Sequence, residues 1–241
     1  MYGRFVSHEL RVRDVDAAAA FYGDLLGWEF TDHPMGKSIT CDGTPIGGAS
    51  PVKPGVPDHW AACVAVPDVD AAASAARTAG GIVTTGDPVD IPGTGRLAPI
   101  LDPAKSIFLT LTPAPGTPAP GFPQSAAPAT GHFIWHRLRT PDAQQAAAFY
   151  REVLGWTTVP SPDGTAAIAH LADGTRVAEL ITTTDAAGWL PFVLVPSADT
   201  ARTRAESLGA TTTDPVDIPG VGRFTVITDP QGAELAVHEA R

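Results

Sequence analysis

An eight-residue stretch that occurs twice is the feature that most constrains how this chain can fold. The stretch FYGDLLGW at residues 21–28 returns as FYREVLGW at residues 149–156, 128 positions further along. A seven-residue stretch, DPVDIPG, occurs at residues 87–93 and again at residues 214–220, with an offset of 127. Two long echoes at nearly the same offset indicate a duplicated structural unit. We therefore predict two similar halves in tandem.

The join between the halves is predicted from proline. Six prolines fall between Thr112 and Thr130, at positions 113, 115, 118, 120, 123 and 128. Because proline removes a backbone donor and fixes φ, this segment cannot sustain a helix or a central strand, and proline-rich segments of this kind form semi-rigid linkers. The predicted organisation is a first domain at residues 1–112, a linker at 113–130 and a second domain at 131–241.

The composition indicates a soluble globular protein and argues against several kinds of partner. The hydrophobic fraction of 44% is enough for real cores, and 241 residues allow two domains. A formal net charge of −10 argues against nucleic acid and anionic membranes, which require basic patches. The sequence has neither a continuous apolar run of about 18 residues nor a hydrophobic export core. With only Cys41 and Cys63, no disulfide framework is expected. The expected location is the cytoplasm.

Strands and helices are predicted in an order that repeats. In the first half, a helix is expected at residues 15–26, with Asp14 as its N-cap and Gly27 at its end. In the second half, a helix is expected at residues 141–154 after a Thr140 cap. The other predicted elements are helices at residues 69–79 and 198–208 and strands at residues 4–12, 28–31, 38–41, 45–50, 60–66, 82–89, 97–101, 107–111, 132–139 and 190–195. The pattern predicts an α+β fold of four βαβββ units, two in each half.

Further motifs accompany the repeated stretch and suggest a family. Leu-Arg-Val-x-Asp occupies residues 10–14, and Asp-Pro pairs occur at residues 102–103 and 229–230. Together with Phe-Tyr and Leu-Gly-Trp they resemble the vicinal oxygen chelate superfamily, which includes glyoxalase I, extradiol dioxygenases, fosfomycin-modifying enzymes and bleomycin-binding resistance proteins. The resemblance implies cupped, mostly antiparallel sheets with helices outside and a ligand cavity within. Because this fold serves many functions, it does not identify the ligand.

Strand alternation assigns side chains to the two faces of each sheet. The sets expected beneath the helices are Val6, His8, Leu10 and Val12, and Ile134, His136, Leu138 and Thr140. The sets expected to line the cups are Phe5, Ser7, Glu9 and Arg11, and Phe133, Trp135, Arg137 and Arg139. By the same alternation, the cup walls also include Ala61, Cys63, Ala65, Leu190, Phe192 and Leu194.

A resident metal is not expected from this pattern. His8 and His136 occupy equivalent positions, but they fall on the helix-facing side, so we interpret them as structural. The resemblance implies metal-ligand positions that are here Ser7, Trp135, Ala61, Leu190, Gly48, Glu179, Leu109 and Ala236. Only Glu179 offers a carboxylate, and a lone carboxylate does not hold such an ion tightly. An improvised site of Glu179, Glu234 and His238 stays open as an alternative, but we expect no cofactor.

The expected ligand is a small apolar or aromatic metabolite that carries a carbonyl or a carboxylate. The resemblance implies that Arg11 and Arg139 contact such a group, because they match the cup-facing arginine of the family, and a guanidinium is an effective anion clamp. The alternative is a fixed ion pair, for example between Arg11 and Glu9. The residues expected to bind ligand are Ser7, Arg11, Cys63, Trp135, Arg137, Arg139 and Phe192. The second half is expected to hold the better-equipped site.

Two classes of function remain open from the sequence. The leading hypothesis is capture of the ligand, as in resistance proteins that sequester an antibiotic. The rival hypothesis is a cofactor-free isomerase, cyclase or lyase of secondary metabolism, with Glu9, Glu179, Glu234 or His238 as general base. A metal-dependent lyase or dioxygenase is a weaker third option. The only expected partner is a small molecule, with no nucleic acid and no membrane, and the chain is expected to be a monomer or a homodimer.

Overall fold

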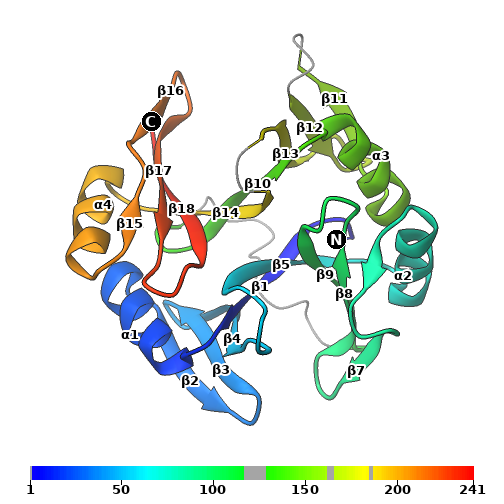
Figure 1. Ribbon diagram of the computed structural model, residues 1–241, viewed down its shortest axis with the longest axis horizontal. Helices are drawn as coiled ribbons and strands as arrows, with labels where there is room; N and C mark the ends of the chain where they lie inside the picture. Colours follow the sequence, from blue (N-terminus) through cyan, green and yellow to red (C-terminus); the bar gives the residue numbers. More distant parts are fainter. Residues whose placement is uncertain (1, 117–128, 162–165, 185–186) are drawn as a thin grey trace. The chain divides into compact units, whose positions relative to one another are not determined.

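The computed structural model of the chain describes residues 2–116, 129–161, 166–184 and 187–241 (Figure 1). The helices in these residues are α1 (Val15–Leu26), α2 (Val69–Thr78), α3 (Ala143–Leu154) and α4 (Ala198–Ser207). The strands of the first half are β1 (Phe5–Val12), β2 (Glu29–His33), β3 (Gly36–Cys41), β4 (Thr44–Pro51), β5 (His59–Ala65), β6 (Ile82–Val83), β7 (Val89–Ile91), β8 (Gly95–Leu101) and β9 (Ile107–Pro113). Those of the second half are β10 (Phe133–Thr140), β11 (Thr157–Pro160), β12 (Ala166–His170), β13 (Arg176–Thr182), β14 (Gly188–Leu194), β15 (Thr211–Thr212), β16 (Val216–Ile218), β17 (Gly222–Thr228) and β18 (Glu234–Ala240). None of the helices described is long and apolar enough to cross a membrane.

The strands form two curled sheets with the same topology. The hydrogen-bonded order is β2-β3-β4-β1-β5-β9-β8-β6 in one sheet and β11-β12-β13-β10-β14-β18-β17-β15 in the other, with β7 pairing with β8 and β16 with β17. Four pairings are parallel, namely β1 with β4, β5 with β9, β10 with β13, and β14 with β18. The other registers described are antiparallel. The predicted α+β class with four strand–helix–strand units is therefore confirmed.

Side-chain caps explain where the helices begin. The Asp14 carboxylate accepts the Ala17 N–H at 2.9 Å, and Gly27 ends α1 in the left-handed region at φ 71°, as the sequence predicted. The prediction for α3 was wrong by two residues. Its cap is Asp142, not Thr140, because the Asp142 carboxylate accepts the N–H groups of Gln144 and Gln145, both at 2.9 Å.

The predicted linker overlaps one strand. β9 continues to Pro113, which pairs with Gly95, so the first residue of the predicted segment is still sheet. Residues 117–128 of the linker lie outside the described residues.

The compact units of the structure cut across the two sequence halves. Unit 1 contains Met1–Val6, Ala61–Ala119 and His136–Trp189, and unit 2 contains Ser7–Trp60, Pro120–Trp135 and Leu190–Arg241. The four strands β1, β5, β10 and β14 each pass from one unit to the other within their own length. Each unit therefore draws on both halves of the chain.

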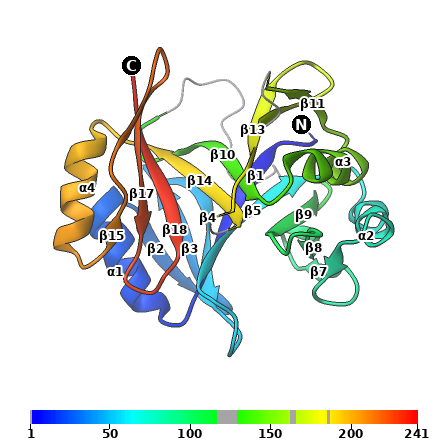
Figure 2. The same ribbon diagram turned by 45° about the horizontal axis from the view of Figure 1, so that its top comes forward.

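In unit 1, helices α2 and α3 lie side by side (Figures 1 and 2) and share one core. At its centre Trp189 Nε1 donates to Tyr150 Oη at 2.8 Å, and Tyr150 Oη donates to Asp102 Oδ2 at 3.0 Å. Burial raises the pKa of Asp102, although hydrogen bonds from Ser106 and Tyr150 oppose that change. The chain of hydrogen bonds ties the repeated stretch of the second half to the Asp-Pro turn of the first half.

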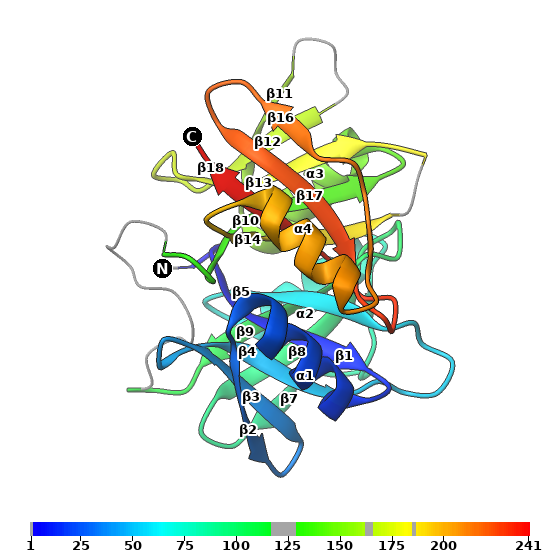
Figure 3. The same cartoon turned by 90° about the vertical axis from the view of Figure 1, so that its left-hand side faces the viewer.

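Unit 2 has the corresponding arrangement, with α1 and α4 side by side (Figures 1 and 3). Trp60 Nε1 donates to Tyr22 Oη at 3.0 Å, and Tyr22 Oη donates to Asp229 Oδ2 at 2.9 Å. The other carboxylate oxygen of Asp229 accepts the backbone N–H groups of Gln231, Gly232 and Ala233. Buried polar groups must find partners, and these do. The repeated Phe-Tyr and Asp-Pro motifs are therefore structural.

The repeated DPVDIPG stretch also has a structural role. Arg96 pairs with Asp90 of this stretch and with Asp70 in the first turn of α2, at 3.1 and 2.7 Å. In unit 2, Arg223 pairs with Asp217 and with Asp199 in the first turn of α4, at 2.6 and 3.2 Å. In both units an arginine links the hairpin to a helix N-terminus, and the acidic side chain also suits the positive end of the helix dipole.

Candidate functional site

One face of β1 in unit 2 carries two charged side chains, Glu9 and Arg11, that have no partner among the described residues. Glu9 and Arg11 are both half-buried and lie two residues apart, so they share the face opposite Leu10 and Val12, which pack on α1. Within the described part of the chain, neither side chain makes a hydrogen bond or an ion pair within 4.0 Å. The ion pair between Arg11 and Glu9 that the sequence left open is thus not formed.

The position across from Glu9 leaves room for its carboxylate. β4 runs parallel to β1 with Glu9 opposite Gly48 and Arg11 opposite Ser50. A Cβ atom at Gly48 would lie 3.0 Å from Glu9 Oε2 and 3.2 Å from Oε1. The missing side chain therefore provides the space that the carboxylate occupies. Burial raises the pKa of Glu9, and the positive charge of Arg11 partly offsets that change.

The charge of Arg11 also acts on His59, the first residue of β5. Its Nδ1 lies 2.8 Å from the carbonyl oxygen of Pro57. Because a carbonyl only accepts, Nδ1 carries the proton, and Nε2 of the neutral ring keeps its lone pair. Burial lowers the pKa of His59, and the charge of Arg11 lowers it further. Sequence reasoning missed this residue, although His59 stands two positions before Ala61 on a face already assigned by alternation.

In unit 1, one of the two arginines predicted for the second-half site is already paired. Arg137 Nε lies 2.7 Å from Glu179 Oε2, across parallel strands in which the two residues are register partners. The side chains are 18% and 23% exposed, so the pair is largely shielded from water. Arg139 is half-buried two residues further along. The pairing neutralises the charges of Arg137 and Glu179, two of the predicted site residues.

Trp135 and Phe192 belong to an apolar cluster of unit 2 that is separate from the helix core. The members of this cluster are Leu190, Phe192, Phe224 and Ala236, with Ile134, Trp135, Ile218 and Val226 partly buried against it. His238 is buried, which lowers its pKa, and Glu234 Oε1 accepts a hydrogen bond from Thr228 at 3.3 Å. Trp135 and Phe192 thus lie in one apolar cluster. The carboxylate of Glu234 already accepts a hydrogen bond.

The predicted faces are wrong at the start of β1 and at the start of β10. Ile134 was expected beneath the helix but packs with Trp135 in the cluster of Phe192. Val6 was likewise expected beneath the helix but packs with Cys63, Ala61 and Ala65 in unit 1. Phe5 and Phe133, which were expected in the cups, lie instead in the helix cores of units 1 and 2. β1 passes from unit 1 to unit 2 after Val6, and β10 passes from unit 2 to unit 1 after Trp135. The residues before each crossing therefore pack in a different unit from those after it.

The other predicted residues are buried. Cys63 lies among apolar side chains of unit 1, and Ser7 is 8% exposed. His8 stacks on Phe133 with ring centroids 3.5 Å apart, and His136 stacks on Phe5 at 3.6 Å. Both histidines are buried, so the structure places them in packing environments.

The donor set does not fit the divalent metal that the family fold suggests. Among the described residues, no three His, Cys, Asp or Glu side chains come together in a way that could hold an ion. Glu179 is committed to Arg137. Glu234 and His238 are four residues apart on one strand, or about 13 Å at roughly 3.3 Å per residue. That separation is too long for two ligands of one ion, so Glu234 and His238 do not form a metal site together.

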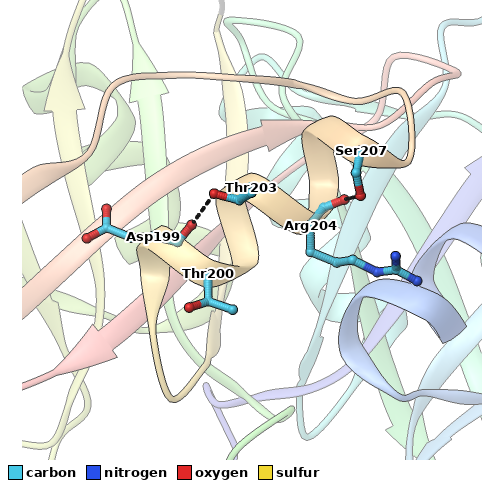
Figure 4. A pocket seen from close by; sticks show the side chains of 5 residues that line it. All are labelled: Asp199, Thr200, Thr203, Arg204 and Ser207. Atoms are coloured by element: carbon cyan, nitrogen blue, oxygen red, sulfur yellow. Dashed lines mark hydrogen bonds between the residues drawn. The ribbon is translucent and has the colours of Figure 1, made fainter.

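Two hollows lie on the surface of unit 2. One of about 470 Å³ is lined by Asp199, Thr200, Thr203, Arg204 and Ser207 of α4 (Figure 4). The hydroxyl groups of Thr203 and Ser207 donate to carbonyl oxygens of their own helix. Another of about 330 Å³ lies in unit 2 between α1 and the turn at Pro230. Ligand sites combine apolar walls with convergent polar groups, and the two hydroxyl groups of the α4 hollow are already used within the helix.

Comparison with known proteins identifies the family. Residues 135–238 match the family model of a glyoxalase-like domain, and residues 4–42 match that of a bleomycin resistance protein-like N-terminal segment. The chain is 31% identical to "Putative glyoxylase CFP32" of Mycobacterium tuberculosis, over 95% of this chain and 92% of that protein. It is 32% identical to the anthracycline biosynthesis protein DauV of Streptomyces sp. strain C5, over 95% and 90%. The chain therefore belongs to the glyoxalase-like family of the vicinal oxygen chelate superfamily.

Solved structures agree on the fold. The Mn(II)-bound glyoxalase of Novosphingobium aromaticivorans superposes with a TM-score of 0.71 at 17% identity, covering 99% of this chain and 82% of that chain. The 2,3-dioxygenase LapB of Pseudomonas sp. KL28 gives a TM-score of 0.66 at 15% identity, covering 98% and 92%. The family resemblance predicted from the sequence is thus confirmed.

Proposed function

We propose that this protein binds a small, largely apolar or aromatic metabolite that carries a carbonyl or carboxylate group, and that it does so without a resident divalent metal. The observation that carries the proposal is Arg11, a half-buried guanidinium that no acidic side chain of the described chain holds within 4.0 Å. Such a group is a ready anion and carbonyl clamp. Metal independence is supported by the donor set, which offers no group of three ligands among the described residues.

The relatives support an aromatic ligand. Two of them, DauV and DnrV, are named as anthracycline biosynthesis proteins, at 32% and 31% identity. Anthracyclines are fused-ring aromatic compounds that carry several carbonyl groups, and a guanidinium can donate hydrogen bonds to such oxygens. Binding can itself be the function, as in sequestration of a toxic metabolite.

We place the clamp on Arg11 rather than on the second half. The sequence favoured the second half, but Arg137 is held there by Glu179 at 2.7 Å, and breaking a shielded pair to bind a ligand is costly. Trp135 and Phe192 remain proposed as apolar contacts, and Arg139 as the competing clamp.

The test is calorimetric titration of the purified protein with anthraquinone-2-carboxylate, a fused-ring aromatic with carbonyl and carboxylate oxygens. Loss of a charged hydrogen bond in Arg11→Ala should raise Kd about 10- to 150-fold, the equivalent of about 1.5–3 kcal/mol. Arg151→Ala is the matched control, because Arg151 is 65% exposed and paired with Glu152; its Kd should not change. A larger effect of Arg139→Ala than of Arg11→Ala would move the site to the second half, and no binding by the parent would refute the proposal.

A further inference from the structure

Among the described residues, the outermost strand of one sheet, β2, leaves a row of backbone hydrogen-bonding groups unpaired at the sheet edge (Figure 1). We propose that two copies of this chain pair along β2, antiparallel and edge to edge, and so form a two-fold symmetric homodimer. This inference goes beyond the proposed function, because it concerns an edge of the sheet and requires no ligand.

The register of β2 with β3 decides which backbone groups point outward. His33 lies opposite Gly36 across a two-residue loop, so these residues form a hydrogen-bonded pair. Because such pairs alternate along an antiparallel ladder, Thr31 also bonds to β3, whereas the N–H and C=O groups of Phe30 and Asp32 point away from it. In the part of the chain that the structure describes, neither backbone makes a hydrogen bond outside this sheet, and no second strand pairs with β2. Two residues of the edge can therefore bond to another strand.

The other edge strands of the two sheets are less suited to pairing. β6 and β15 have two residues each, β7 and β16 have three each, and β11 has four and ends in Pro160. Short strands and proline keep sheet edges from pairing with other chains. β2 has five residues and no proline, so it is the longest edge strand in the described part of the chain. It is the edge at which a second chain can add most easily.

The charged side chains of β2 complement a second copy of the same strand. Charges on an edge normally oppose pairing with an unlike strand. An antiparallel pair centred on Thr31, however, places Glu29 of each copy opposite His33 of the other. The same register aligns the outward backbone groups of Phe30 with those of Asp32. A register centred on Asp32 would instead set two carboxylates opposite each other, which is unfavourable. Charge and backbone hydrogen bonding thus favour the same two-fold register.

The hydrogen-bonding groups of Glu29 and His33 also match. His33 Nδ1 accepts the Met35 N–H at 3.2 Å, so the proton of the neutral ring lies on Nε2, which is a donor. Glu29 Oε2 accepts the Thr40 hydroxyl at 3.3 Å, which leaves Oε1 as an acceptor. Both side chains are exposed, and in the proposed register they form pairs without backbone hydrogen bonds, where side chains approach most closely. Each His33 ring can therefore donate to Glu29 of the other copy.

The experiment is analytical ultracentrifugation of the full chain at protein concentrations from micromolar to millimolar. The parent should show a concentration-dependent equilibrium between monomer and dimer. Glu29→Lys and His33→Glu should each raise the dimer Kd about tenfold or more, because each variant removes two attractive pairs and sets like charges opposite each other. The exchanged variant Glu29→His with His33→Glu restores the opposite pairs and should return the Kd to within about threefold of the parent. A merely structural role of either residue would not give this restoration.

Two further variants test the backbone bonds. Asp32→Pro removes an outward N–H and should abolish the dimer. Asp32→Ala is the matched control, because it also loses the contact with Lys37 but keeps the N–H, and its Kd should equal that of the parent. Glu152→Lys, at a side chain that is 59% exposed on α3, controls for the change of charge and should not alter the Kd.

Three results would overturn the inference. A parent that stays monomeric up to millimolar concentration has no such interface. A dimer with the same Kd in the parent and in Asp32→Pro uses another surface of the chain. An exchanged variant that stays as weak as the single variants contradicts the pairing of Glu29 with His33.

Discussion

Replacing His8 by phenylalanine should make the protein less sensitive to acid. His8 is 1% exposed, and burial lowers its pKa from 6.5 to about 3, so the folded protein holds the ring neutral down to low pH. The unfolded chain takes up the proton near pH 6.5. Below that pH the unfolded state binds more protons than the folded state, so stability falls as pH falls between about 6.5 and 3. At 1.36 kcal/mol per pH unit, the His8 contribution to this loss between pH 7 and pH 5 is about 2 kcal/mol.

The assay is urea unfolding followed by tryptophan fluorescence at pH 7, 6 and 5, for the parent and for His8→Phe. Phenylalanine keeps a ring stacked on Phe133, although it loses the hydrogen bond to the Ile46 backbone. That loss shifts the whole curve and not its slope, and the other titrating groups are common to both proteins. The parent should lose about 2 kcal/mol more than the variant over this range. His33→Phe, at an exposed position, is the matched control and should follow the parent. Parallel curves for the parent and His8→Phe would refute the reasoning.

Other expected outcomes concern the hydrogen-bond chain, the hairpin arginine, the cap glycine and the metal. Tyr22→Phe leaves the Trp60 N–H and an Asp229 oxygen buried without their partner, and should cost about 2–4 kcal/mol in urea unfolding; a loss below about 1 kcal/mol would mean that water replaces the hydroxyl group. Arg96→Gln removes pairs whose side chains are 35%, 57% and 80% exposed, and should cost no more than about 1 kcal/mol in the same assay. Gly27→Ala puts a side chain at φ 71° and should lower stability by about 1 kcal/mol, measured by thermal unfolding. Elemental analysis of protein purified without chelators should find substoichiometric Zn, Mn, Fe and Ni, and a stoichiometric ion would contradict metal independence.

The sequence was sufficient for the elements and the fold because their signals are local. Asp14 and Gly27 mark the ends of α1 as the structure has them, and the repeated stretch indicated a duplicated fold. The cap of α3 was misplaced since Thr140 and Asp142 are both good caps, and only the hydrogen bonds decide between them. Capping and repeat patterns thus predicted the helices and strands, with an error of two residues at the start of α3.

The candidate site was harder to predict because its members depend on partners far along the chain. The register of β1 with β4 decides which residues lie opposite Arg11, and the register of β10 with β13 decides which lie opposite Arg137. Alternation alone does not give these registers. Ile134 shows the second difficulty, since alternation alone does not reveal that β10 passes between units, and Ile134 packs in a different unit from Leu138. His59 could have been found by extending the face of Ala61 by two residues.

The passage of strands between the two units has a consequence for the order of folding during synthesis. The core of unit 1 is complete once Trp189 has been made, whereas the core of unit 2 joins Leu10 to residues as late as Val237. At about 5–20 residues per second, the ribosome needs several more seconds to supply that last part. During this interval the apolar face of α1 lacks its last packing partners, whereas all core residues of unit 1 have been synthesised. The first helix to be synthesised is therefore among the last to be buried, and it is the segment for which a chaperone would be most useful.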